Sequence, residues 1–170
     1  MLLPSTIAAL RVKNTFEPEH RGTEIRSDYS SKTPKVEIIA GTRSVWAMEL
    51  FDQDMVGDPS YGQKMNDLVF ESGVRVLTKD FNANTVTFYL KGNKRRINWL
   101  MDRLQANYTN ADIRVEKMAM VSAIGSDMKV PGLLKSAASA LSDAGVNILS
   151  VHQAMRQVDM MFIVADQDYA

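Results

Sequence analysis

"GSDMKVPGLLKSAASALSDAGVNILSVHQ", Gly125 to Gln153, has the layout of a strand end, a turn, a helix and a second strand. Pro131 lies near the expected first turn of that helix, and Gly145 is the expected stop. About seventy residues earlier "DQDMVGDPSYGQKMNDLVFESGVRVLTKDF", Asp52 to Phe81, has the same layout. The chain therefore contains one structural unit twice.

Two pairs of identical dipeptides define the offset between the repeats. Asp127-Met128 stands 73 positions after Asp54-Met55, and Gly145-Val146 stands 72 positions after Gly73-Val74. The slip of one residue falls between them, in the turn and helix start, where insertions are tolerated.

The block from Ser44 to Glu116 predicts the order βαββαβ. Apolar residues recur at helical spacing in two stretches: Tyr61, Met65, Leu68 and Val69, and then Ile97, Leu100, Met101 and Leu104. Apolar and aromatic runs predict four strands, namely Val45–Phe51, Val74–Phe81, Thr85–Leu90 and Asp112–Glu116.

The block from Lys117 is one strand short. It has three strand candidates, and Asp166 is expected to cap a helix just before the last residue, Ala170. The short strand candidate Val36–Ala40, which is expected to end at Gly41, is not needed by the first module. We therefore predict that it pairs with Met118–Ile124. The fold class is α+β, with two ferredoxin-like βαββαβ modules, the first inserted in the second. Upstream, Leu10–Asn14 is a strand candidate and residues 15–35 are expected to be loop and linker.

Composition excludes several classes of protein. The 170 residues include 20 basic and 20 acidic side chains, so no net field attracts nucleic acid or a membrane surface. The basic run Gly92–Trp99 is expected to be a solvated helix start. There is no cysteine, and His20 and His152 are far apart in sequence, which argues against a metal site. No apolar run approaches the roughly 18 residues of a membrane helix. We expect a cytoplasmic protein.

These motifs carry a resemblance to a known family. The tandem modules, with a turn of the GxGM type and a helix that ends in Ala144-Gly145-Val146-Asn147-Ile148, look like ACT domains. The second repeat is similar to the second ACT domain of aspartokinases, and "LRVKNTFEPEHRGTEI", Leu10 to Ile25, resembles the segment that closes the aspartokinase catalytic domain. The implied division is 1–35 as catalytic-domain tail and linker, 44–116 as first ACT domain, and 36–43 plus 117–170 as second.

The resemblance implies the regulatory part of an aspartate kinase. Such an enzyme phosphorylates L-aspartate with ATP and Mg²⁺ at the start of lysine, threonine and methionine biosynthesis. No catalytic residue of the family can be placed in this chain, so residues 1–170 are expected to be inactive alone. The resemblance also implies a homodimer formed through the ACT domains, because open sheet edges need covering.

An amino-acid effector, lysine and/or threonine, is the implied ligand. A strand-to-helix turn offers backbone N–H groups to its carboxylate, and Asp or Asn side chains can take its ammonium group. By analogy with the family, the site lies between two ACT modules. The candidates are Asp52, Asp54, Met55, Val56 and Gly57 in the turn, Arg75, Val76 and Thr78 on the next strand, and Asn147 and Ile148 in the second module.

Other interpretations of these residues stay open. Asp52, Asp54 and Asp58 are equally typical of turn and cap positions, Met55 is typical of a core, and Arg75 and Val76 replace the family's usual Asn-Ile. A stand-alone amino-acid-binding or purely dimerising ACT module is the alternative function. A nucleic-acid-binding ferredoxin-like fold would need an RNP-like aromatic pattern, which "VTFYL" does not supply.

Overall fold

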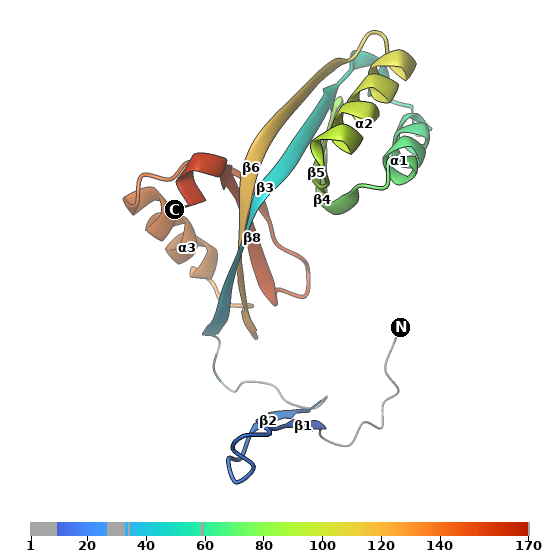
Figure 1. Cartoon of the computed structure of the whole chain (residues 1–170). Coiled ribbons are helices and arrows are strands. Elements are labelled where there is room, and N and C mark those ends of the chain that lie inside the picture. The colour runs from blue at the N-terminus through green and yellow to red at the C-terminus, as the bar shows by residue number, and fades with distance from the viewer. Residues whose placement is uncertain (1–9, 27–32, 34, 59, 170) are drawn as a thin grey trace.

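The computed structural model describes residues 10–26, 33, 35–58 and 60–169. From β3 to β8 the helices and strands follow one another in the predicted order (Figure 1). The elements are β1 (Leu10–Val12), β2 (Thr23–Ile25), β3 (Lys35–Phe51), η1 (Gln53–Met55), α1 (Tyr61–Glu71), β4 (Arg75–Phe81), β5 (Thr85–Lys91), α2 (Lys94–Asn107), β6 (Asp112–Ser126), α3 (Leu133–Asp143), β7 (Ile148–His152), β8 (Asp159–Ala165) and η2 (Asp166–Tyr169).

One six-stranded antiparallel sheet contains both modules, in the order β4-β5-β3-β6-β8-β7. The first module uses the second half of β3 and the first half of β6, with β4 and β5. The second module uses the other halves of β3 and β6, with β8 and β7. Each set of four strands has the ferredoxin-like order, so the predicted fold class is confirmed, with the first module inserted in the second.

The predicted partner of Val36–Ala40 is confirmed. Ile39 pairs with Ala123 and Ala40 pairs with Ser122, both on β6. The prediction that Gly41 ends this strand is wrong, because β3 continues to Phe51. The register shifts between Thr42 and Val45, where Ser44 has a φ of 56°, so a β-bulge joins the halves of β3.

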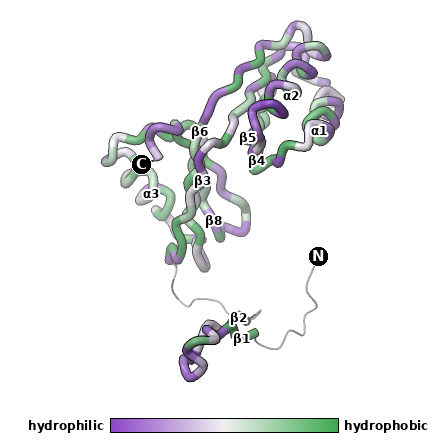
Figure 2. The backbone as a smooth tube through the Cα atoms, in the orientation of Figure 1, coloured by the Kyte–Doolittle hydropathy of each residue, from purple (hydrophilic) through white to green (hydrophobic). Residues whose placement is uncertain are grey.

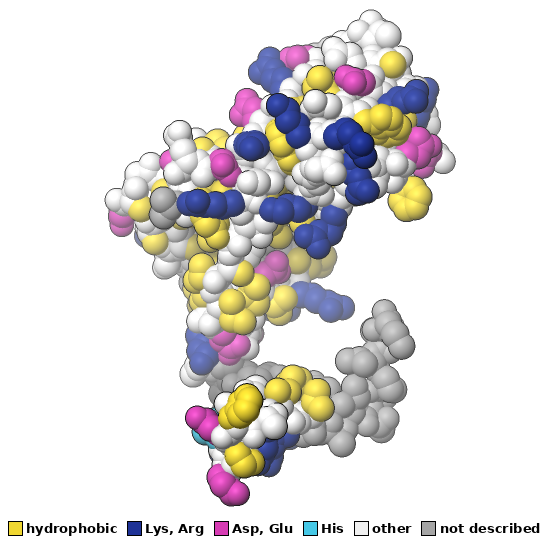
Figure 3. All heavy atoms as spheres, in the orientation of Figure 1, with side chains coloured by type: hydrophobic (Ala, Val, Ile, Leu, Met, Phe, Trp, Pro, Cys, Tyr) yellow, Lys and Arg dark blue, Asp and Glu magenta, His cyan; other side chains and the backbone are white. Residues whose placement is uncertain are grey.

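Strand β2 was missed by the sequence analysis, which expected loop there. It pairs with β1 in a separate two-stranded ribbon, for example Arg11 with Glu24, which also form an ion pair at 3.0 Å. Residues 1–9 and 27–32 of the predicted catalytic-domain tail and linker lie outside the described residues. Figure 3 shows hydrophobic side chains on this ribbon, and Leu10, Val12 and Ile25 are all more than half exposed.

The first module has the larger core. Both of its helices pack on one face of the sheet, and α2 contributes the predicted stripe of Ile97, Leu100 and Leu104, each no more than 1% exposed. Figure 2 shows much of the rest of α2 as hydrophilic, as expected for a helix with one buried face. Asn93 caps α2 by accepting a hydrogen bond from the backbone N–H of Arg96.

The second module has a single α-helix. Helix α3 packs Leu133, Ala137 and Leu141 against Met160 and Phe162 of β8. It begins at Leu133, after Gly132 with a φ of 90°, so Pro131 lies two residues before the helix, near its first turn as predicted. The predicted stops at Gly73 and Gly145 both have left-handed φ values, 65° and 74°.

Asp166 does not begin an α-helix. It starts η2, and its carboxylate accepts a hydrogen bond from the backbone N–H of Ser44 at 3.1 Å. The side chain predicted as a helix cap therefore holds the bulge of β3.

Truncating Leu100 tests the core of the first module. Leu100→Ala is expected to lower the free energy of unfolding by about 2–5 kcal/mol, because it removes a fully buried side chain and leaves a cavity. Urea denaturation measures the change. Leu134→Ala is the matched control, since Leu134 lies on α3 with 39% of its surface exposed. Equal losses in the two variants would contradict this assignment of the core.

Candidate effector-binding site

The first part of the predicted site is the turn after β3. Asp52, only 5% exposed, is the N-cap of η1 and accepts a hydrogen bond from the backbone N–H of Asp54 at 2.9 Å. The Tyr61 hydroxyl donates to the other carboxylate oxygen of Asp52. Burial raises the pKa of Tyr61, and the bond to Asp52 raises it further, so this phenol stays a donor at neutral pH.

The remaining turn residues divide between core and solvent. Met55 is 3% exposed and belongs to the core of the first module, whereas Val56 is 57% exposed. Gly57 has a φ of 83° and no atom crowds the place of a Cβ, so it supplies the turn conformation and leaves the backbone open. Nδ2 of Asn110 lies 3.5 Å from a carboxylate oxygen of Asp54.

Asp58 is a turn residue. Its carboxylate accepts hydrogen bonds from the hydroxyl and the backbone N–H of Ser60, and these two bonds lower its pKa. The structure thus gives Asp52 and Asp58 the capping and turn contacts that the sequence left open as an alternative.

The candidates on β4 lie some distance from the turn. Arg75 and Val76 are exposed, and Thr78 is half-buried. Arg75 pairs with Lys91 at one end of the β4–β5 ladder, whereas Asp52 follows the Phe51–Thr85 pair at the other end. Six residues of strand separate these ends, which is roughly 20 Å. Among the described residues no hydrogen bond joins the turn to Arg75, Val76 or Thr78.

The second-module candidates lie at the start of β7: Asn147 precedes the strand and Ile148 is its first residue. Asn147 is exposed, and Ile148 is half-buried against the core that α3 covers. They stand 72 positions after Arg75 and Val76, so the two pairs occupy equivalent places in the two repeats.

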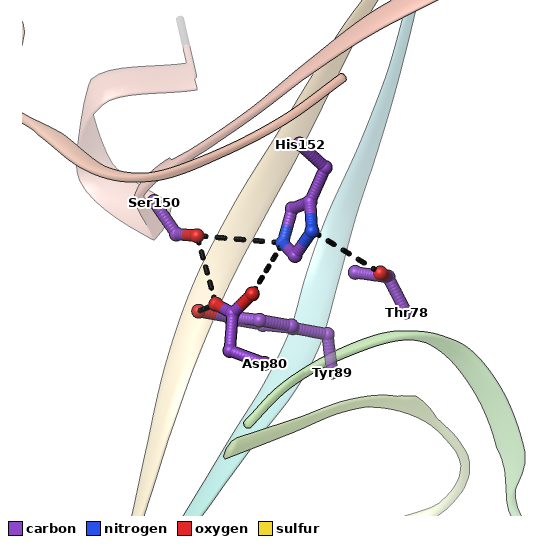
Figure 4. A network of polar contacts seen from close by, with 5 residues as sticks. All are labelled: Thr78, Asp80, Tyr89, Ser150 and His152. Carbon is purple, nitrogen blue, oxygen red and sulfur yellow. Dashed lines mark hydrogen bonds and ion pairs between the residues drawn. The ribbon is translucent and has the colours of Figure 1, made fainter. Parts of the chain in front are cut away.

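A polar network that the sequence analysis missed joins the two modules (Figure 4). The Asp80 carboxylate accepts hydrogen bonds from Ser150 at 2.8 Å and from Tyr89 at 3.0 Å, and Nε2 of His152 lies 3.3 Å from its other oxygen. The hydroxyl of Thr78 lies 3.5 Å from Nδ1 of His152. Among the predicted site residues, only Thr78 belongs to this network. The available signal was the 72-residue spacing that relates Thr78 to Ser150 and Asp80 to His152.

A cavity of about 200 Å³ lies beside this network, between the modules. Tyr89 and Leu149 line it, and Glu49, Arg114 and Glu116 bring charged groups to it. Arg114 donates to Asp112 at 2.7 Å. Burial raises the pKa of Tyr89 to about 12, so its hydroxyl remains a hydrogen-bond donor to Asp80.

Among the described residues, no group of three or more His, Asp and Glu side chains gathers where it could hold a metal ion. No helix in this part of the chain has the length and apolar content to cross a membrane.

The fold defines the class of the chain, a tandem pair of ferredoxin-like βαββαβ modules, the first inserted in the second. No family model matches the sequence. The chain is 45% identical over 160 residues to the aspartate kinase Ask_Ect of Stutzerimonas stutzeri (strain A1501). That match covers 94% of the chain but only 34% of the relative, so the chain spans about a third of its length. The resemblance to the regulatory region of aspartokinases is thereby confirmed.

Solved structures agree on the fold. The chain superposes on the aspartate kinase of Clostridium acetobutylicum with a TM-score of 0.85 at 20% identity, covering 95% of this chain and 39% of that one. With E. coli aspartokinase III in complex with lysine and aspartate the TM-score is 0.72 at 18% identity, and the match covers 94% of this chain and 36% of that one. The regulatory subunit of aspartate kinase from Thermus flavus gives 0.67 at 16%, covering 78% of this chain and 90% of that subunit.

The Tyr61–Asp52 hydrogen bond fixes the turn, and its removal tests that role. Tyr61→Phe is expected to lower the free energy of unfolding by about 1–3 kcal/mol, because a nearly buried carboxylate loses a donor. Chemical denaturation measures the loss. Ser60→Ala is the control, since it removes a bond to the exposed Asp58 and should change stability by less than about 0.5 kcal/mol. A Tyr61→Phe protein as stable as this control would refute the role.

Proposed function

We propose that this chain is the amino-acid-sensing and dimerising part of an aspartate kinase. The parent enzyme would phosphorylate L-aspartate with ATP and Mg²⁺ at the start of lysine, threonine and methionine biosynthesis, in the cytoplasm. The observation that carries the proposal is the 45% identity to an aspartate kinase over 94% of the chain, which includes both modules. The Thermus flavus regulatory subunit supports the regulatory role, because the chain matches most of its length.

The proposed effector is lysine and/or threonine. The E. coli aspartokinase III structure contains lysine, and this chain matches its fold. In our proposal the backbone N–H groups around Gly57 bind the ligand carboxylate, and the carboxylate of Asp54 binds the ligand ammonium group. Arg75, Val76 and Thr78, with Asn147 and Ile148, line the opposing strands. Because the turn and Arg75 lie at opposite ends of the β4–β5 ladder, we infer that a complete site uses the turn of one module and the Arg75 end of a strand of another.

A homodimer would bring such modules together. Among the described residues β4 pairs only with β5, so its outer edge offers backbone groups to a further strand. A groove of about 530 Å³ runs between this edge and α1 and is lined by Val69, Val76 and Phe88. Phe70, at the rim, is 87% exposed. An open edge beside exposed apolar side chains is the surface that a second copy of the chain would cover.

Amino-acid binding is tested by a thermal-shift screen of the chain against the protein amino acids. Lysine or threonine at 100 times its Kd should add about 2.7 kcal/mol of stability. Arg75→Ala and Asn147→Ala should each raise the dissociation constant of the amino acid about tenfold and so reduce the thermal shift. Arg95→Ala, on the exposed face of α2, should leave the dissociation constant unchanged. A screen in which no amino acid shifts the transition would leave only a dimerising role and contradict the sensing function.

The dimer is tested by sedimentation. Phe70→Glu is expected to raise the dimer dissociation constant at least about 30-fold, because it places a charge beside the apolar groove of the proposed contact. Phe16→Glu is the matched control, since Phe16 is 93% exposed but lies in the loop of the β1–β2 ribbon. A parent chain that is monomeric at micromolar concentration, or equal effects of the two variants, would argue against this interface.

A further inference from the structure

The network between the modules is built from equivalent positions of the two repeats. Ser150 stands 72 positions after Thr78, and His152 stands 72 positions after Asp80. The strands also share an irregularity. The register of β4 shifts between Val76 and Thr78, and that of β7 shifts between Ile148 and Ser150. A bulge therefore lies at the same place in both edge strands.

The contacts follow a local two-fold pattern. Thr78 meets His152 and Asp80 meets Ser150, so the first position of each strand contacts the second position of the other. Asp80 and His152 meet each other between these two contacts. This reciprocity is the mark of an isologous interface, which here lies within one chain.

The hydrogen-bonding capacities of the four side chains match. With Nε2–H directed at the carboxylate of Asp80, Nδ1 of His152 is an acceptor for the hydroxyl of Thr78. The second carboxylate oxygen of Asp80 accepts hydrogen bonds from the hydroxyls of Ser150 and Tyr89. Side-chain exposures of 36% for Asp80 and 20% for His152 leave the network at the edge of the interface, next to solvent.

Two other features connect the modules. An apolar junction cluster fills the space between their helix-free faces: Val45, Ala47, Tyr89, Met120 and Ile163, with Leu77, Met118 and Met161. On the far side, β3 and β6 cross from one module to the other through the bulge at Thr42–Val45. The junction cluster thus lies between the bulge of β3, on one side, and the side-chain network of β4 and β7, on the other.

We propose that Asp80, His152, Thr78 and Ser150 form a latch that sets the angle between the two modules. Strand β4 carries two of the latch residues, Thr78 and Asp80. It also carries the proposed effector contacts Arg75 and Val76, so a ligand that shifts β4 changes the contacts of the latch. The inference about the ligand rests on the proposed function, but the latch itself does not. The bulge of β3 is the hinge about which the modules turn when the latch is broken.

Distance measurements between two spin labels test the latch. The chain has no cysteine, so Asp102→Cys on α2 and Lys135→Cys on α3 give one label in each module. The parent chain should give one narrow distance distribution. Asp80→His and His152→Asp, each alone, should broaden it by about twofold or more, because each places two like residues opposite one another. Glu71→Gln, a charge change at the exposed end of α1, should leave it narrow.

The exchanged double variant is the decisive sample. Because the two positions are equivalent, Asp80→His with His152→Asp restores the pair in reversed order, and the narrow distribution should return. Circular dichroism on each variant establishes that it is folded before it is labelled. Single variants as narrow as the parent, or a double variant as broad as the singles, would overturn the latch.

Adding lysine or threonine separates this inference from the proposed function. If either shifts the distance in the parent chain and in the double variant but not in the single variants, the ligand acts through the latch. If neither amino acid binds the parent while the single variants still broaden the distribution, the sensing function fails and the latch stands. A ligand shift of the same size in the single variants would overturn the coupling of β4 to the latch.

Discussion

The antiparallel pairing of β3 with β6 is the constraint on which the other features depend. The two strands are hydrogen-bonded from Lys35–Ser126 to Phe51–Asp112, so both run through the two modules, with β3 central in the first and β6 central in the second. In an ordinary tandem repeat a flexible linker would separate the two sheets. Here the backbone ladder continues across the boundary, and the modules cannot separate without breaking it. The insertion of one module in the other produces this continuity, because the chain enters and leaves the first module on neighbouring strands.

Sharing two strands also determines which faces meet. Helices α1 and α2 cover one face of the first module, and α3 covers a face of the second, on the other side of the long strands (Figure 1). The helix-free faces are turned toward each other and bury the junction cluster. An antiparallel sheet with one uncovered apolar face is unstable alone. Each module therefore uses the other as the second layer of its own core.

Much of this could be predicted from the sequence, since it depends on local patterns. Helical spacing identified α1 and α2, the glycines at 73 and 145 marked two helix ends, and a count of strands placed Val36–Ala40 beside β6. The strand end wrongly expected at Gly41 has a long-range cause. Gly41 and Ser44 resemble strand breakers, yet the ladder continues through them because Asp166 binds the backbone of Ser44 and Tyr169 packs where a Cβ of residue 41 would lie. Those partners are more than a hundred residues away, beyond the reach of local propensity.

The network was missed for a different reason, and that reason explains its composition. Residues next to a local two-fold axis face their own equivalents, so two identical repeats would place Asp against Asp or His against His. Two carboxylates at this distance repel, and two neutral imidazoles satisfy each other poorly. A complementary pair on the axis requires the two repeats to differ there, which a symmetric homodimer cannot do and a tandem chain can. Asp80 and His152 are thus visible only when the repeats are aligned and then examined where they disagree.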